Sequence, residues 1–271
     1  MRVWVLGSGS EGNAVLVECG ESRVLVDAGF APRTLASRLQ SIGVAPASIE
    51  ACVVTHEHGD HAKGAAAGAM RWGWALYATD GTMEASPGLR AAGCTSVSSG
   101  VPVSLTRLTL TTRDTPHDAA SPVGVRLECM RTGATTVVCT DVGHVSASVR
   151  TLCERADILV LESNHDEGML RAGPYPPSVQ ARIGSGTGHL SNRACADLAR
   201  DVVHRDLTHV VLAHLSERCN DHGLAHQTAA GSLRQRRFGG TLSVAMQHAV
   251  VGPFMPRAGR GEAPPQYALA L

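Results

Sequence analysis

The sequence has few aromatic residues, a single lysine and no excess of either charge. Aromatic residues make up 3% of its 271 residues, so the core must be built mostly from valine, leucine, alanine and isoleucine. The 24 basic and 24 acidic residues balance, which argues against a broad polybasic surface but not against a local basic patch. Lys63 is the only lysine. The preference for arginine reflects either composition bias or the use of fork-shaped phosphate contacts.

Long apolar runs and paired cysteine motifs are also absent. None of the eight cysteines forms a C-x-x-C pair, so we expect buried small hydrophobic residues and not a disulfide framework. No stretch approaches the ~20 apolar residues that cross a bilayer, and the first residues lack the apolar region of a signal peptide. We therefore expect a cytoplasmic protein with no membrane partner.

Short apolar runs that end in polar turns dominate the chain, and helical spacing appears between them. We predict strands at 3–6, 14–18, 23–26, 49–55, 105–111, 123–129, 135–139, 158–161, 209–212 and 242–246, and helices at 34–42, 62–72, 192–204 and 224–237. This order fits the α/β class and an αββα sandwich, in which two mixed β-sheets flanked by helices pack face to face. We expect one catalytic domain over residues 1–250, followed by a Pro/Gly/Ala-rich tail at 251–271.

The strongest motif is a run of metal-binding residue types directly after an apolar strand. His56, His58, Asp60 and His61 form the pattern H-x-H-x-D-H. Neutral imidazole and carboxylate groups are the ligands that zinc prefers. In an extended turn His56 and His58 share a face, whereas Asp60 and His61 begin a helix and can face a second ion. One loop can thus serve two divalent metal ions. Zn²⁺ is the expected ion, and Mn²⁺ also fits such ligands.

This run resembles the signature of the metallo-β-lactamase superfamily, which implies further ligands downstream in a fixed order. His117, Asp141 and His214 match those positions. The resemblance implies that His117 joins His56 and His58 on one ion and that His214 joins Asp60 and His61 on the other, with Asp141 as the bridge. The matching aspartate for orienting the histidine loop is Asp27, although a carboxylate at a strand end can also simply cap the next turn.

A second pair resembles the nuclease branches of this superfamily. There a histidine protonates the leaving oxygen and a carboxylate holds it, and His189 and Glu162 match these positions. We count Asp60 with them among the catalytic residues. The helix start at Ser191 and Asn192 offers backbone N–H groups to a phosphate. His165 is expected to line the same pocket. Arg182 is a candidate phosphate contact, together with Arg171, Arg193 and Arg218.

The finer motifs are similar to those of the YycJ (WalJ) group, which is regarded as metal-dependent DNA exonucleases acting 5′ to 3′. They are S-G-S-x-G-N, T-H-E-H-x-D-H, P-H-D-A-A-x-P-V-G, L-E-S-N-H-D, G-H-L-S-N and A-H-L-S-E. The chain departs from that group at Glu11, Gly59, Ser121 and His144, which puts substrate detail in doubt and not metal binding. Glu162 and His189 are too close in sequence to hold the cap domain of the β-CASP nucleases. No long arm like that of ribonuclease Z is visible.

The resemblance implies phosphodiester hydrolysis, with DNA as the substrate and two metal ions that activate a bridging water. The alternative is a small-molecule hydrolase that uses the same cage on an ester, thioester or lactam. A flavodiiron protein would have glutamate where His58 stands. A regulatory binder without activity would usually lose ligands, and its purified protein would hold no metal.

Overall fold

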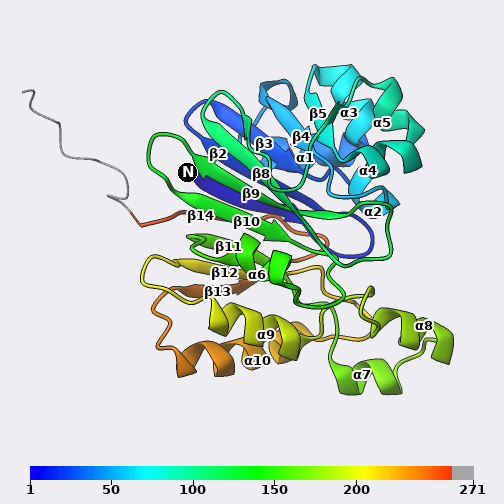
Figure 1. The fold of residues 1–271 in the computed structure, drawn as a ribbon, viewed down its shortest axis with the longest axis vertical. Coiled ribbons are helices and arrows are strands. Elements are labelled where there is room, and N and C mark those ends of the chain that lie inside the picture. The colour runs from blue at the N-terminus through cyan, green and yellow to red at the C-terminus, as the bar shows by residue number, and fades with distance from the viewer. Residues whose placement is uncertain (258–271) are drawn as a thin grey trace, which may run out of the picture.

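The computed structural model describes residues 1–257 and arranges them in four layers, helices–sheet–sheet–helices (Figure 1). The first sheet has the strand order β14-β1-β2-β3-β4-β5-β6, and the second has the order β13-β12-β11-β10-β9-β8-β7. Both sheets are mixed: β3, β4 and β5 run parallel to one another, as do β10, β11 and β12, while β1–β2 and β8–β9 are antiparallel. The αββα sandwich predicted from the sequence is confirmed.

The strands of the first sheet are β1 (Arg2–Gly7), β2 (Ala14–Cys19), β3 (Ser22–Val26), β4 (Ala51–Val53), β5 (Ala75–Ala78), β6 (Thr95–Ser96) and β14 (Val251–Phe254). Those of the second are β7 (Val103–Ser104), β8 (Leu108–Asp114), β9 (Val123–Cys129), β10 (Thr135–Cys139), β11 (Ile158–Glu162), β12 (His209–Ala213) and β13 (Thr241–Val244).

Helices cover the outer face of each sheet. On the first sheet they are α1 (Pro32–Ser41), α2 (Gly59–Ala62), α3 (Ala65–Trp72), α4 (Asp80–Ala85) and α5 (Pro87–Ala91), with a short 3₁₀ turn at Pro46–Ser48. On the second they are α6 (Ala147–Cys153), α9 (Asn192–Asp201) and α10 (His222–Gln235). Two short helices, α7 (Glu167–Ala172) and α8 (Pro177–Ile183), project from the body beyond α9 (Figure 1).

The alternation of side chains along the strands builds three apolar layers. In β1, Val3 and Val5 face the second sheet, whereas Trp4 and Leu6 face the helices of the first. This is the period of two that a pleated strand imposes. A third layer packs the second sheet against α6, α9 and α10. The core is rich in valine, leucine and alanine, as the scarcity of aromatic residues requires.

The last strand lies beyond the domain boundary predicted at residue 250. β14 pairs antiparallel with β1, with Val3 opposite Phe254 and Val5 opposite Val251. The Pro/Gly/Ala-rich composition predicted a tail here, but β14 is the edge strand of its sheet, where proline is tolerated because one side of the strand forms no ladder of hydrogen bonds. The domain therefore extends at least through Phe254. Residues 258–271 of the predicted tail lie outside the described residues.

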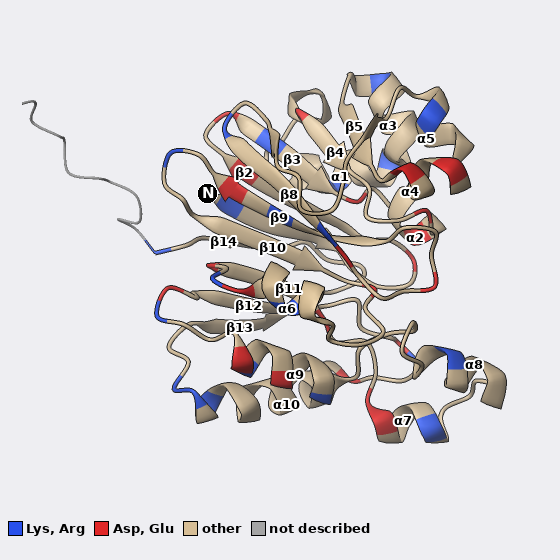
Figure 2. Ribbon diagram, viewed as in Figure 1, with Lys and Arg blue, Asp and Glu red and all other residues tan. Residues whose placement is uncertain are grey.

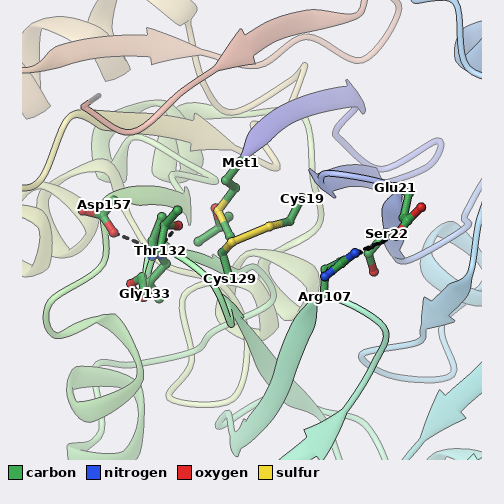
Figure 3. Close-up of a disulfide and its surroundings, with 12 residues drawn as sticks. Met1, Cys19, Glu21, Ser22, Arg107, Cys129, Thr132, Gly133 and Asp157 are labelled. Carbon is green, nitrogen blue, oxygen red and sulfur yellow. Dashed lines mark hydrogen bonds and ion pairs between the residues drawn. A yellow bond between two sulfur atoms is a disulfide. The ribbon is translucent and has the colours of Figure 1, made fainter. Parts of the chain in front are cut away.

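One disulfide is an exception to the expectation that the cysteines are buried small hydrophobic residues and not a disulfide framework. Cys19, at the end of β2, is bonded to Cys129, at the end of β9, so the bond joins the two sheets (Figure 3). Beside it an ion pair between Arg107 and Glu21, 3.0 Å from Nη2 to Oε1, also connects the sheets. The other six cysteines are free. Sequence spacing could not reveal this pair, because its members lie 110 residues apart.

Acidic and basic residues are interspersed on the helices in the view of Figure 2, in keeping with the balanced composition. No helix within residues 1–257 combines the length and the apolar character that crossing a bilayer requires.

Candidate metal centre

The predicted metal-binding side chains follow strands whose carboxyl ends lie at one end of the sandwich. Loops after parallel strands meet at the same edge of a sheet, and here both sheets contribute. His56 and His58 follow β4, Asp60 and His61 lie in α2, His117 follows β8, Asp141 follows β10, and His214 follows β12.

Two groups of three side chains are each compact enough to hold one ion. Within each group the possible ligand atoms lie within 4.8 Å of one another, and the groups are His56, His58 and His117, and Asp60, His61 and His214. Asp141 lies between them: its Oδ2 is 2.9 Å from His61 Nε2, and its Oδ1 is 3.6 Å from His117 Nε2. The structure thus brings together all seven side chains in the grouping expected from the resemblance.

Neighbouring groups hold the imidazole rings so that one nitrogen of each points into the cluster. The contacts are His61 Nδ1 to Asp27 Oδ2 at 2.7 Å, His117 Nδ1 to the Gly188 carbonyl at 2.9 Å, His214 Nδ1 to Glu162 Oε1 at 2.8 Å, and His56 Nδ1 to Thr55 Oγ1 at 3.0 Å. A partner of this kind on one ring nitrogen leaves Nε2 for a metal ion. His58 is turned the other way, with its Nδ1 3.4 Å from His117 Nε2.

The buried polar atoms of the cluster fit a site for divalent cations. His56 Nε2 and His214 Nε2 are buried and have no hydrogen-bond partner within residues 1–257, and the buried Asp141 Oδ2 has there only its ion-pair contact with His61 Nε2. Buried polar atoms normally have partners, and leaving one without a partner costs free energy. Imidazole nitrogens and carboxylate oxygens that converge in this way are a donor set for zinc and similar divalent ions.

Burial and charge act against each other on the central carboxylates. Burial alone would raise the pKa of Asp141, but His214 and His61 beside it hold that pKa well below its usual range. Burial would likewise raise the pKa of Glu162, but His189 lowers it to about 2. Both groups are therefore anionic at neutral pH, and buried anions need compensating positive charge.

Three residues of the centre hold an unusual backbone conformation. Asp27, Asp141 and His214 have φ of 64°, 57° and 54°. This left-handed region costs a residue with a side chain about 1 kcal/mol or more, and such residues gather at functional sites. Each of the three comes just after a strand, so the turn that ends the strand also aims the side chain at the cluster.

Three residues that had no predicted role hold the ligand loops together: Asn13, Ser8 and Thr55. The backbone N–H of Asn13 donates to the Asp60 carbonyl at 2.7 Å, and its side-chain Nδ2 lies 3.1 Å from His61 Nε2. Ser8 Oγ accepts from the His214 N–H at 2.8 Å. Ser8 and Asn13 belong to S-G-S-x-G-N and Thr55 to T-H-E-H-x-D-H, so motif membership was the available signal.

A close backbone approach beside Asn13 requires glycine. A Cβ at Gly29 would lie 1.6 Å from the Asp60 carbonyl oxygen. The Gly29 N–H also donates to the Asn13 carbonyl at 2.9 Å. The loop after β3 can therefore lie directly against the metal loop, which brings Asp27 within reach of His61.

Asp27 offers a direct test of ligand orientation. Replacing Asp27 with asparagine keeps the size of the side chain and suits a positive φ, but it removes the charge that holds His61 Nδ1. We expect affinity for Zn²⁺ to fall roughly 10- to 100-fold, measured by competition with a chelator. The exposed Asp114, changed to asparagine, serves as the control. Unchanged affinity in Asp27→Asn would refute an orienting role.

Glu162 and His189 lie together at the edge of the centre. Glu162 Oε1 is 2.8 Å from His189 Nδ1, and Glu162 Oε2 accepts hydrogen bonds from the Val142 and Leu190 N–H groups at 2.8 and 3.1 Å. Burial lowers the pKa of His189, but the Glu162 carboxylate outweighs it and the net pKa is raised. The raised pKa favours the protonated form of His189, which is the form that can donate a proton.

Two of the four predicted substrate-binding residues line a cavity beside the centre, and the other two do not. His165 and Ser191 line a cavity next to His189, but Ser191 Oγ also caps α9 by accepting from the Ala194 N–H at 3.3 Å. Asn192 is buried and does not line that cavity, because its amide bonds to Ser163 and Asn220. Arg182 is exposed and pairs with Asp118, 2.6 Å from Nε to Oδ2.

Comparison with known proteins agrees with this geometry. The chain matches the family model described as "Beta-lactamase superfamily domain" over residues 22–215. It is 32% identical over 241 residues to the exodeoxyribonuclease WalJ of Streptococcus pneumoniae serotype 2 (strain D39), over 87% of this chain and 89% of that protein. It is also 32% identical over 239 residues to the exodeoxyribonuclease YycJ of Bacillus anthracis, over 87% and 90%. The structure of the metallo-β-lactamase fold protein YhfI from Bacillus subtilis covers 92% of this chain and 98% of its own, with a TM-score of 0.69 at 18% identity.

Proposed function

Because the chain belongs to the β-lactamase superfamily, in the group of the WalJ and YycJ exodeoxyribonucleases, we propose that it is a metal-dependent hydrolase that removes nucleotides from DNA, acting 5′ to 3′. The observation that carries this proposal is the Glu162–His189 pair beside a seven-residue metal cluster. A buried carboxylate that holds a protonated histidine next to a cation site suits the hydrolysis of an ester with a poor leaving group. The predicted cytoplasmic location stays a prediction.

Two divalent ions, Zn²⁺ or Mn²⁺, would be held by His56, His58 and His117 and by Asp60, His61 and His214, with Asp141 between them. When bound, such ions neutralise phosphate oxygens and lower the pKa of water towards ~7. The protein's own side chains supply the remaining part of the reaction, the transfer of a proton to the leaving group.

His189 is the proposed general acid. Water forms a new P–O bond and gives up a proton to solvent, the P–O3′ bond breaks, and O3′ takes the proton of His189, which solvent then replaces. Glu162 holds His189 Nδ1, so the proton leaves from Nε2. Glu162 Oε1 also contacts His214 Nδ1 at 2.8 Å, so this carboxylate connects the general acid to a metal ligand. Asp60, at the rim of the cluster, is the carboxylate placed closest to solvent.

The proposal is tested by incubating metal-loaded protein with single- and double-stranded DNA and RNA labelled at either end. We expect mononucleotides from the 5′ end of DNA and no digestion after treatment with a chelator. The control is the same protein with its metal restored. Hydrolysis of a chromogenic ester without any hydrolysis of DNA would overturn the proposal in favour of a small-molecule hydrolase.

A further inference from the structure

A cavity of about 460 Å³ is lined by His189 and by none of the seven candidate metal ligands. Its walls come from α7 and α8, which extend past the body of the sandwich in Figure 1, and from the start of α9. Leu170, Pro177 and Ala181 give it an apolar surface, and Gln180 and Ser191 add polar groups. Its volume lies in the lower part of the range for small-ligand pockets, roughly 300–1,000 Å³. It therefore suits one nucleoside and not a length of strand.

One wall of the cavity carries a buried polar group without a partner. The His165 side chain is 3% exposed, and its Nδ1 makes no hydrogen bond to any residue from 1 to 257. The backbone of His165 is fixed, because its carbonyl accepts from the Asn192 N–H at 2.8 Å. Burial lowers the pKa of this imidazole, so at neutral pH the ring is uncharged and can act as donor or acceptor. His165 thus contributes a neutral imidazole to the wall of the cavity.

The wall of the cavity also carries a cation, Arg171. Arg171, in the wall, forms no salt bridge with the residues that the structure describes, while the neighbouring Glu167 is paired with Arg193 at 2.9 Å. An apolar surface for a base, polar groups for a sugar and a guanidinium for a phosphate are the features that a nucleotide requires.

From this arrangement we propose that the cavity binds the terminal nucleoside of the strand as the leaving group of the hydrolysis. This inference rests on the proposed function, in which His189 is the acid that protonates the leaving oxygen. His189 lines the cavity, so the group that departs with that oxygen lies there. For digestion from the 5′ end the leaving oxygen is O3′ of the first nucleoside. A cavity of one-nucleoside size beside His189 can hold the nucleoside at a strand end.

The test replaces an exposed residue of the cavity wall with a larger one, whose side chain fills the cavity. Ala181 is exposed on α8, a helix without buried residues, and its side chain lines the cavity. Ala181→Trp is therefore expected to weaken binding of deoxythymidine 5′-monophosphate to the metal-loaded protein by roughly tenfold or more, measured by equilibrium dialysis, because the indole takes the place of the base. Ser178→Trp is the matched control, since Ser178 is exposed on the same helix and does not line the cavity. Inorganic phosphate should bind equally to both variants.

The same variants separate this inference from the proposed function. If wild type and Ser178→Trp digest DNA while Ala181→Trp loses both nucleotide binding and digestion, the cavity is the terminal-nucleoside site. If all three digest DNA and bind the nucleotide alike, the inference is wrong and the nuclease proposal stands. If wild type binds the nucleotide through the cavity but digests no DNA, the proposed function is wrong, and with it the assignment of a leaving group.

Discussion

Replacing Asp141 with asparagine is expected to remove divalent metal from the protein and to lower DNA hydrolysis by about a thousandfold or more. Metal-ion catalysis supplies several kcal/mol of transition-state stabilisation, and each ~1.4 kcal/mol is a factor of ten in rate. Among the residues that the structure describes, Asp141 is the carboxylate that reaches both three-residue groups, so its loss affects both ions. Asparagine is preferred to alanine because φ is 57° at this position, and asparagine tolerates that conformation better.

Metal content per chain by elemental analysis, together with DNA digestion at saturating metal, measures the effect. Asp114→Asn, on the exposed end of β8, should keep both ions and full activity. Circular dichroism of the metal-free proteins should be alike, which separates loss of metal from loss of fold. An Asp141→Asn variant that retains two ions and full activity would show that Asp141 is not a ligand.

How much of this centre the sequence predicts depends on the distance between its parts along the chain. His56, His58, Asp60 and His61 lie within six residues, so a strand and a helix start are enough to bring them together. His117, Asp141 and His214 are separated by tens of residues, and nothing local indicates that their loops meet. They were identified because their order matches a known superfamily, and the parallel arrangement of β10, β11 and β12 explains why the match corresponds to proximity.

The further contacts of the site residues, and the direction in which their side chains point, were harder to predict than the candidate ligands. Glu162 was expected to hold His189, but its contact with His214 depends on the register of β11 against β12, which places Glu162 opposite Ala213. Asn192 was expected to face substrate, yet its position after the capping Ser191 turns its amide into the protein. A capping residue and the first residue of its helix point in different directions, and sequence alone does not show which of them faces the cavity.

Little in the sequence indicates the two short helices that line the proposed nucleoside cavity. α7 has six residues and α8 has seven, too few for an apolar periodicity to stand out, and α8 buries none of its side chains. Both begin at recognisable residues, Asp166 as a cap and Pro177 in the first turn. No helix was predicted from the sequence for either segment, and nothing in it indicated that they lie beside His189.

Replacing His189 with alanine is expected to slow DNA hydrolysis by roughly 10²- to 10⁴-fold while the protein keeps its metal, because a positioned general acid contributes about that much. Measuring metal content matters here, since His189, Glu162, Asp141 and His214 also lie close enough together to be considered as an ion site. Loss of metal from His189→Ala would make His189 a ligand. Because Glu162 holds His189 Nδ1, Nε2 is the nitrogen left to carry either the proton or an ion, and the metal content of the variant decides between these two roles.

The choice of leaving group makes this test specific for proton donation. p-Nitrophenolate leaves without protonation, so a p-nitrophenyl ester of deoxythymidine 5′-monophosphate should react at nearly the same rate with wild type and His189→Ala. Hydrolysis of DNA, whose leaving alkoxide must be protonated, should be slower with His189→Ala than with wild type. A variant that slows both substrates equally would show that His189 binds substrate or supports the centre. A variant that cleaves DNA at the wild-type rate would show that His189 has no part in the reaction.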